Sequence, residues 1–353
     1  MEGRAGGERP SDESQVRCGH TIVRWGDNRG DDIDIVNIQC YRWGPSGTGG
    51  TLCGGVPSFF VHRSRDEKRG SPKAPHVTTM HWLPDATRTR GMTTDELRTS
   101  FVVQGLFQPG AVTLRLIDLD RVVLGGAVPT TAPLRLEAPP ELLTDAFCSR
   151  RELGVLNIGA PGVVTVDGVP HPLGPRDLLY VGRGSRDVLF TSDDSARPAR
   201  FYLVSYPAHA DHPTTCVSAA AVQSGEIGAM ETANRRRIAR YIHTDGIRSA
   251  QLVMGMTALE PGSVWNTMPA HTHTRRTEVY LYFDLPADAI VLHLLGEPTE
   301  TRHVIVRDAE VVLSPGWSIH SGCGTTSYAF CWAMGGENQD YADMQIVAPT
   351  TLR

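Results

Sequence analysis

From residue 100 onward, short apolar runs and alternating apolar and polar residues are separated by Gly, Pro and Asp. Alternation with a period of two is typical of β-strands, and turn residues at regular spacing are typical of sandwiches and barrels. Clear examples are residues 112–117, 162–168 and 188–190. The pattern predicts an all-β fold built from jelly-roll β-barrels.

An internal repeat predicts that there are two barrels. Residues 164–175 align with residues 303–315 when one turn residue is allowed. On this alignment Tyr180 takes the position of His320. The two halves therefore share a pattern but not the same polar side chains, and we expect the first barrel to be structural.

The same pattern divides the chain into three parts. Residues 1–79 are rich in Gly, Ser, Arg and Asp, so we expect a disordered or non-native extension. Residues 80–230 are predicted to form the first barrel, and residues 92–97 to open a helix with a Thr/Asp cap and an acidic first turn. Residues 231–353 are predicted to form a linking helix, over 232–241, and the second barrel.

Candidate metal ligands lie in the second barrel. On a strand, the imidazoles of His271 and His273 would point the same way. A following strand begins with Glu278, and a Pro-Gly turn leads to His320. Thirteen histidines make a chance His-x-His pair common, so the prediction depends on these neighbouring strands. Three imidazoles and one carboxylate suit Zn²⁺ first, with Mn²⁺, Fe²⁺ and Ni²⁺ as alternatives.

Several sequence segments around these residues resemble segments of known proteins. The segments are residues 265–273, 296–303, 314–322 and 335–339, with residues 150–159 and 177–182 upstream. They resemble the family of 5-dehydro-4-deoxy-D-glucuronate isomerases in the cupin superfamily, from about Met92 to the C-terminus. The resemblance implies a bicupin with one metal site, a homohexamer, and isomerisation of 4-deoxy-L-threo-5-hexosulose uronate in pectin breakdown.

Such an isomerase moves a carbonyl group by one carbon, either through an enediol or by a hydride shift. The enediol path needs a base that carries a proton between neighbouring carbons. Tyr280 and Tyr282 share the strand face of Glu278, and Glu337 follows a later strand, so all three are candidates. The sequence does not choose between them.

The carboxylate of a sugar acid requires a basic partner. Arg275, Arg276 and Arg302 are the arginines closest in sequence to the ligands and are candidates for substrate binding. The only lysines are Lys68 and Lys73, outside the predicted barrels, which argues against Schiff-base chemistry.

The amino-acid composition limits the cellular compartment and the binding partners that we expect. A net charge of −5 argues against a nucleic-acid surface, and no apolar run approaches membrane-spanning length. Seven cysteines without a C-x-x-C pair favour a reduced, cytoplasmic compartment. Two alternatives share the ligand pattern: the 5-deoxyglucuronate isomerase of inositol catabolism and an iron cupin dioxygenase. A third is a sugar-acid sensor without catalysis.

Overall fold

The structure is a computed structural model that describes residues 16–26, 32–42, 51–52, 80–337 and 343–353. The chain divides into two units, Met1–Ala74 and Pro75–Arg353. No helix among the described residues is both long and apolar enough to cross a membrane.

The described part of the first unit is a small antiparallel sheet. β1 (Val16–Gly26) pairs with β2 (Asp32–Arg42), and β3 (Thr51–Leu52) extends the sheet. The structure thus describes strands within the predicted extension, and β-branched residues in β2 favour extended backbone despite the polar composition around them. The rest of the predicted extension up to residue 79 lies outside the described residues.

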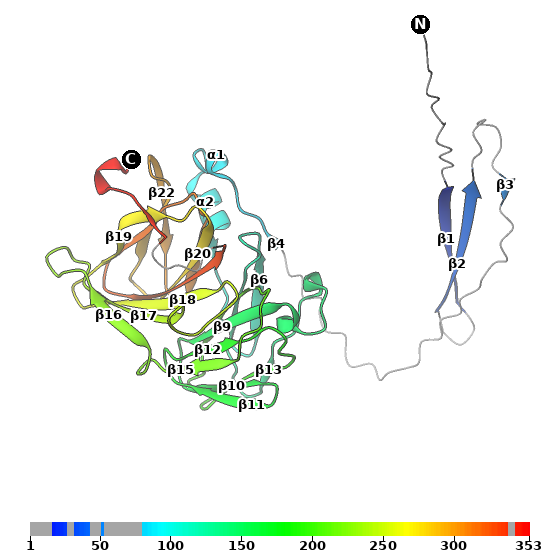
Figure 1. Cartoon of the computed structure of the whole chain (residues 1–353), viewed down its shortest axis with the longest axis horizontal. Helices are drawn as coiled ribbons and strands as arrows, with labels where there is room; N and C mark the ends of the chain where they lie inside the picture. Colours follow the sequence, from blue (N-terminus) through cyan, green and yellow to red (C-terminus); the bar gives the residue numbers. More distant parts are fainter. Residues whose placement is uncertain (1–15, 27–31, 43–50, 53–79, 338–342) are drawn as a thin grey trace, which may run out of the picture. The chain divides into compact units, whose positions relative to one another are not determined.

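The second unit contains two barrels, each made of two sheets (Figure 1). The larger sheet of the first barrel has seven strands, in the order β15 (Thr215–Val217), β12 (Leu178–Val181), β9 (Arg151–Asn157), β14 (Phe201–Pro207), β7 (Val123–Ala127), β6 (Val112–Ile117) and β4 (Met80–His81). The smaller sheet has four strands, in the order β11 (Val169–Leu173), β10 (Gly162–Val166), β13 (Val188–Ser192) and β8 (Leu134–Arg135).

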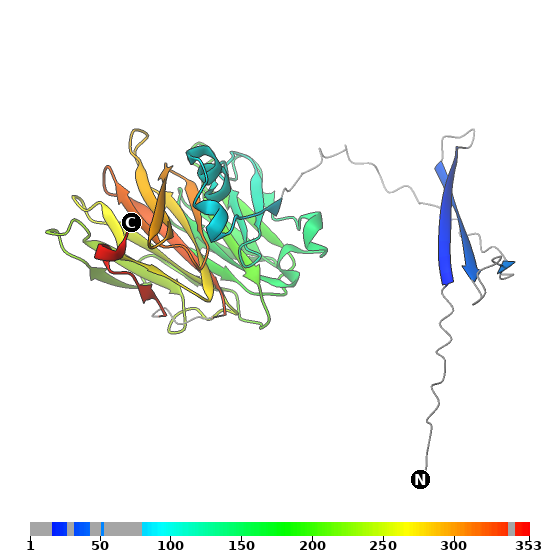
Figure 2. The same cartoon turned by 90° about the horizontal axis from the view of Figure 1, so that it is seen from above.

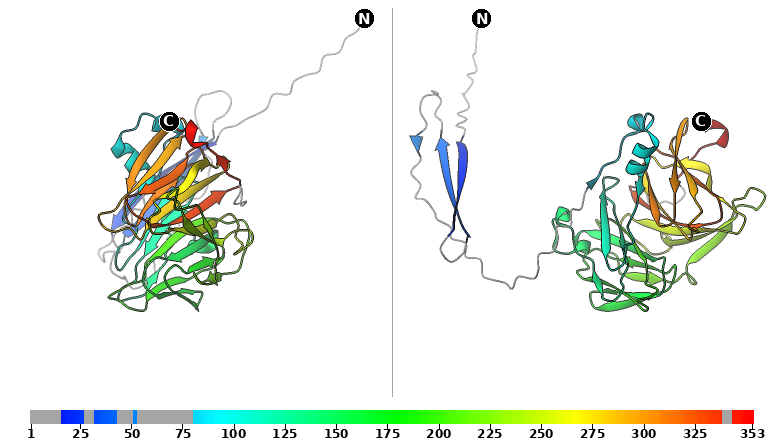
Figure 3. Two further views of the ribbon diagram at one scale, coloured as in Figure 1. Left: turned by 90° about the vertical axis from the view of Figure 1, so that its left-hand side faces the viewer. Right: turned by 180° about the vertical axis from the view of Figure 1, so that it is seen from behind.

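The second barrel repeats this plan with sheets of seven and five strands. The strand order in the larger sheet is β16 (Gln223–Ile227), β17 (Arg236–Ile242), β18 (Val253–Leu259), β25 (Ala329–Gly336), β20 (Arg276–Phe283), β23 (Glu310–Ser314) and β5 (Val102–Val103). The order in the smaller sheet is β22 (Glu300–Val306), β21 (Val291–Glu297), β24 (His320–Gly324), β19 (Trp265–Thr272) and β26 (Gln345–Ile346). The predicted all-β fold with two barrels is confirmed. Figure 3 shows the strands of the two barrels as adjoining groups, green and yellow to red.

The two seven-stranded sheets pack against each other. On β20, Val279 and Leu281 point into a core shared with the first barrel, whereas Tyr280 and Tyr282 point into the core of the second barrel. Alternate residues on β9 divide in the same way between the shared core and the core of the first barrel. Both sheets are therefore buried on two faces, which explains why their strands are nearly continuous apolar runs.

The strand orders correct the predicted internal alignment. The order β12-β9-β14-β7 in the first barrel matches the order β23-β20-β25-β18 in the second. β9 is therefore equivalent to β20 and β12 to β23, and the next strand in the chain, β13, is equivalent to β24. Tyr180, on β12, therefore does not take the place of His320, on β24. The alignment slipped by one strand because successive strands of a jelly roll share the same apolar pattern.

The predicted helix over residues 232–241 is wrong. Residues 236–242 form the strand β17 between β16 and β18. Arg236, Ile238 and Arg240 alternate with Ala239 and Tyr241, a period of two that fits a strand. Three consecutive arginines follow Asn234, and this polar run masks the alternation of the residues after it, so the sequence suggested a helix.

The remaining helices are short: α1 (Ala86–Thr89), α2 (Thr94–Phe101) and single 3₁₀ turns at Pro140–Leu142, Phe147–Ser149 and Pro349–Thr351. The predicted helix start is confirmed, since Thr93 and Glu96 form a capping box.

The structure also moves the predicted boundaries between the barrels. The apolar face of α2 packs in the core of the second barrel, and β5 pairs with β23. Figure 2 shows this early helical segment, in cyan, beside the orange strands of that barrel. β16 belongs to that barrel as well, although it precedes residue 231. The early segment around α2 and β5 thus ties the two halves of the chain together.

Candidate metal centre

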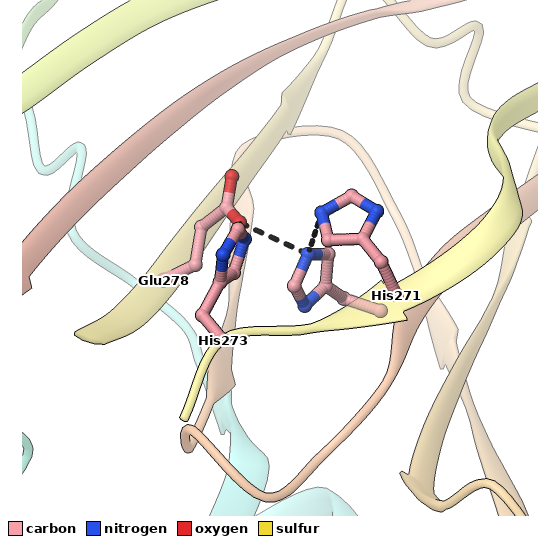
Figure 4. A group of neighbouring side chains, drawn as sticks. His271, His273 and Glu278 are labelled. Atoms are coloured by element: carbon pink, nitrogen blue, oxygen red, sulfur yellow. Dashed lines mark hydrogen bonds and ion pairs between the residues drawn. The ribbon is translucent and has the colours of Figure 1, made fainter. Parts of the chain in front are cut away.

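The four predicted ligands lie inside the second barrel, between its two sheets. His271 on β19 and His320 on β24 are direct partners in an antiparallel pair. His273 follows β19, and Glu278 lies on β20 in the opposite sheet. Figure 4 shows His271, His273 and Glu278 converging from these segments. The structure therefore brings together residues that are 49 positions apart in sequence.

Their side-chain atoms meet at short distances. The Nε2 atoms of His271 and His320 are 2.9 Å apart, and His320 Nε2 is 3.0 Å from Glu278 Oε2. His273 Nε2 lies 3.3 Å from the same oxygen. One ligand atom from each residue falls within 4.8 Å of all the others, and all four side chains are buried.

This arrangement fits a bound cation. Atoms that share an ion at about 2.1 Å lie roughly 3.0–3.4 Å from one another, close to the separations seen here. Apart from these contacts within the cluster, His273 Nε2 and Glu278 Oε2 are buried and have no hydrogen-bond partner among the residues that the structure describes. Buried polar atoms without partners are costly, and coordination of a metal would satisfy both. Among the described residues, this is the single cluster with such a ligand set.

The electrostatics of the cluster favour the forms that bind metals. Burial, together with His320, lowers the pKa of His271 to about 3, so that imidazole is neutral near pH 7. Burial acts to raise the pKa of Glu278, but His320 and His273 outweigh it and hold the pKa well below its usual value. A neutral imidazole at His271 and an ionised carboxylate at Glu278 are states that coordinate divalent ions.

Two local features place His320. Gly316 packs against the backbone of His273, and a Cβ atom at position 316 would lie 2.6 Å from the His273 backbone oxygen. This close approach explains the glycine in the Pro-Gly turn. Ser314 Oγ lies 3.1 Å from His320 Nδ1. Ser314 is also the strand partner of Glu278, so one residue of β23 supports both.

A cavity of about 350 Å³ opens beside the cluster. It is lined by three of the four ligands, by arginines, and by an apolar wall that includes Trp332, Met344 and Ile346. Arg236 and Arg240 on β17 line it as well, and the sequence analysis missed both. Their spacing with Ile238 would have revealed them if this segment had been predicted as a strand.

The catalytic candidates separate clearly. Tyr280 lines the cavity, and its ring centroid is 5.3 Å from that of His320. Tyr282 lies deeper in the barrel, where its hydroxyl shares a 2.7 Å hydrogen bond with His293 Nδ1. Glu337 is exposed and pairs with Arg275 outside the cavity. These placements favour Tyr280 and argue against the other two candidates.

The arginine candidates separate in the same way. Arg276 lines the cavity and is only 2% exposed. Arg275 points to the other side of the strand, toward Glu337. Arg302 lies on β22, where it pairs with Glu300 at 2.8 Å and donates to the backbone oxygen of Thr301. Neither Arg275 nor Arg302 lines the cavity beside the cluster.

Comparison with known proteins gives a consistent result. Residues 111–348 match the KduI/IolB family. The chain is 53% identical over 275 residues, covering 78% of this chain and 99% of the relative, to a 4-deoxy-L-threo-5-hexosulose-uronate ketol-isomerase from Opitutus terrae. It is 54% identical over 266 residues, covering 74% and 95%, to an enzyme of the same name from Kineococcus radiotolerans.

Among solved structures, an IolB-like protein from Salmonella typhimurium LT2 is similar with a TM-score of 0.57. The similarity covers 70% of this chain and 96% of that protein, at 12% sequence identity. It supports the two-barrel fold and carries no information about the reaction.

Proposed function

This chain belongs to the KduI/IolB family, and from that membership we propose that it isomerises 4-deoxy-L-threo-5-hexosulose uronate to 3-deoxy-D-glycero-2,5-hexodiulosonate. The chain is an isomerase that interconverts an aldose and a ketose. One observation carries the proposal: a buried three-histidine, one-glutamate cluster opens onto a cavity in a chain that matches such enzymes over nearly their full length.

The cluster of His271, His273, Glu278 and His320 is proposed to hold one divalent cation per chain. Zn²⁺ is the first candidate, and Mn²⁺, Fe²⁺ and Ni²⁺ suit the same ligands, because imidazole-rich sites select metals by geometry and supply. When bound, such an ion would polarise the carbonyl and neighbouring hydroxyl oxygens of the substrate, which acidifies the C–H bond between them.

The carboxylate of the sugar acid is proposed to lie against β17. Arg236 and Arg240 line the cavity from alternate positions of this strand, in the sheet that also carries Glu278. A guanidinium can hold a carboxylate with two parallel hydrogen bonds, which would orient the substrate. Arg276 lines the same cavity and forms an ion pair with Asp343.

Tyr280 is the proposed proton carrier. It is the one candidate from the sequence analysis that both lines the cavity and lies beside a ligand ring. Proton transfer between two neighbouring carbons requires a group within hydrogen-bond reach of both, and Tyr280 is on the strand that also supplies Glu278. A direct hydride shift would not need this hydroxyl.

The test is to follow the reaction by NMR. The metal-loaded protein should convert 4-deoxy-L-threo-5-hexosulose uronate without nucleotide, phosphate donor or oxygen. Lack of conversion by protein with a full complement of metal would overturn the proposal. Conversion of 5-deoxyglucuronate instead would favour the inositol-type isomerase, and oxygen uptake with Fe²⁺ would favour a dioxygenase. Recovery of the bound sugar acid unchanged would indicate a sensor.

The biological setting follows from the same proposal. We expect the enzyme to act in pectin and polyuronate breakdown in the cytoplasm, as a homohexamer, with the first barrel in a structural role. Light scattering of the purified protein would test the hexamer. A mass equal to one or two chains would contradict it.

A further inference from the structure

Two neighbouring arginines at the start of β20 bind two carboxylates on either side of the strand. Arg275 is exposed and pairs with exposed Glu337. Arg276 has no exposed side-chain surface and pairs with Asp343 in the C-terminal segment. The two pairs are alike in chemistry but differ in burial, and only the second reaches the ligand cluster.

Asp343 and Arg276 both approach His273. Asp343 Oδ1 is 3.6 Å from His273 Nδ1, and Arg276 Nε donates to the same nitrogen at 3.2 Å. The other ring nitrogen, Nε2, faces Glu278 within the cluster. The pair therefore lies at the side of His273 that points away from the other ligands.

The contact at Nδ1 decides which ring nitrogen has a lone pair. When Nδ1 accepts from Arg276, the hydrogen of a neutral imidazole is on Nε2, which then cannot coordinate a cation. When Nδ1–H donates to Asp343, Nε2 has its lone pair directed into the cluster. Asp343 needs to approach by only about 0.7 Å to reach an ordinary hydrogen-bond distance.

The backbone around Asp343 is held against the strand that carries the histidines. β26 pairs with β19, with Ile346 opposite His271. Gln345 Oε1 accepts from the backbone N–H of Thr274 at 3.0 Å and from its hydroxyl at 3.1 Å. These contacts keep Asp343 next to His273 from a segment seventy positions further along the chain.

We propose that Asp343 is a positioning residue for the metal centre, accepting the Nδ1 hydrogen of His273 and so directing Nε2 toward the ion. Arg276 neutralises the partly buried carboxylate and returns to Nδ1 when the ion leaves. This inference rests on the proposed function, since it requires the cluster to bind a divalent cation. Carboxylates that orient metal-binding histidines commonly change metal affinity by about 10–100-fold.

The experiment compares Asp343→Asn with Glu337→Gln in the full-length protein. Each variant loses one carboxylate charge that pairs with an arginine of the 275–276 pair, so Glu337→Gln is a matched control. The dissociation constant of Zn²⁺ is measured by competition with a chromophoric chelator. We expect an increase of about 10–100-fold for Asp343→Asn and less than about twofold for Glu337→Gln. In the loaded protein, NMR should detect a His273 Nδ1 hydrogen that shifts in Asp343→Asn.

The possible failures are distinguishable. Equal Zn²⁺ affinity in Asp343→Asn and the unchanged chain would overturn the role of Asp343 while leaving the metal centre in place. Absence of Zn²⁺ binding by the unchanged chain would overturn both. If Asp343→Asn does not fold, Asp343→Glu keeps the charge next to Arg276 but displaces the carboxylate by one methylene. It should also weaken Zn²⁺ binding, and unchanged affinity there would refute the proposal.

Discussion

The carboxylate of Glu152 accepts a hydrogen bond from the backbone N–H of Leu252 at 2.7 Å, which joins the first barrel to the second. The same carboxylate accepts from the backbone N–H groups of Ala250 and Gln251 and from the hydroxyl of Tyr180. Glu152 has no exposed surface, so these four donors replace water around its charge. The contact is therefore a buried polar anchor between the barrels.

Replacing Glu152 with Gln should destabilise the protein, because an amide oxygen is a weaker acceptor and the amide NH₂ group would face backbone donors. We expect a loss of about 1–3 kcal/mol in the free energy of unfolding, measured with urea. The control is Glu137→Gln, at an exposed position, which should change it by less than about 0.5 kcal/mol. Equal stability of the two variants would show that the anchor contributes nothing.

Removing one metal ligand should empty the centre. In His271→Ala, His273→Ala or His320→Ala, bound metal should fall sharply and turnover should be abolished, because the remaining three ligands lose both affinity and geometry. Elemental analysis provides the measurement. Tyr180→Phe should leave metal content unchanged, since Tyr180 lies in the core between the barrels. Two metals per chain in the unchanged protein would contradict a single site.

The two stacked tyrosines of β20 should differ in importance. Tyr280→Phe should lower kcat by about 100-fold or more, the usual contribution of a proton-transfer group, with metal content unchanged. Tyr282→Phe should retain most activity, since that hydroxyl bonds His293 instead of facing the cavity. In D₂O, solvent deuterium should enter the product. Full activity of Tyr280→Phe, together with no deuterium in the product, would favour a hydride shift.

His293 should make the metal-free protein sensitive to acid. Burial, together with His320, lowers the pKa of His293 from 6.5 to about 3. Between these values the unfolded chain binds a proton that the folded chain does not, so the free energy of unfolding falls as pH decreases. By pH 5 this loss amounts to about 2 kcal/mol.

The comparison variant is His293→Gln, which can still bond Tyr282 but does not titrate. Its free energy of unfolding should change less between pH 7 and pH 5 than that of the unchanged chain, both measured with urea and without metal. Identical changes in the two proteins would show that His293 does not contribute to the acid sensitivity.

A shortened chain that begins at Pro75 should fold and remain active. The division between the two units falls at this residue, and the strand at Met80–His81 that pairs with β6 would be retained. Circular dichroism and the NMR assay provide the measurements. Loss of solubility or activity in the shortened chain would show that residues 1–74 support the enzyme.

The sequence determined those features that depend on spacing within one element. The capping box at Thr93 and Glu96 is visible because both partners lie within one turn of a helix. Strands with alternating residues, such as those within 112–117 and 162–166, were predictable from their period of two. His271, His273 and Glu278 could be proposed as a group because the pattern lies within eight residues, and His320 because a Pro-Gly turn precedes it.

Only the tertiary structure decided which side chains share the site. Arg275 and Arg276 are adjacent in sequence, yet the alternation of the strand places one outside and one in the cavity. Tyr280 and Tyr282 share a face, and depth in the barrel separates them. Asp343 reaches the site next to β26, which pairs with β19 far earlier in the chain, and non-local pairing of this kind leaves no periodic signal in the local sequence.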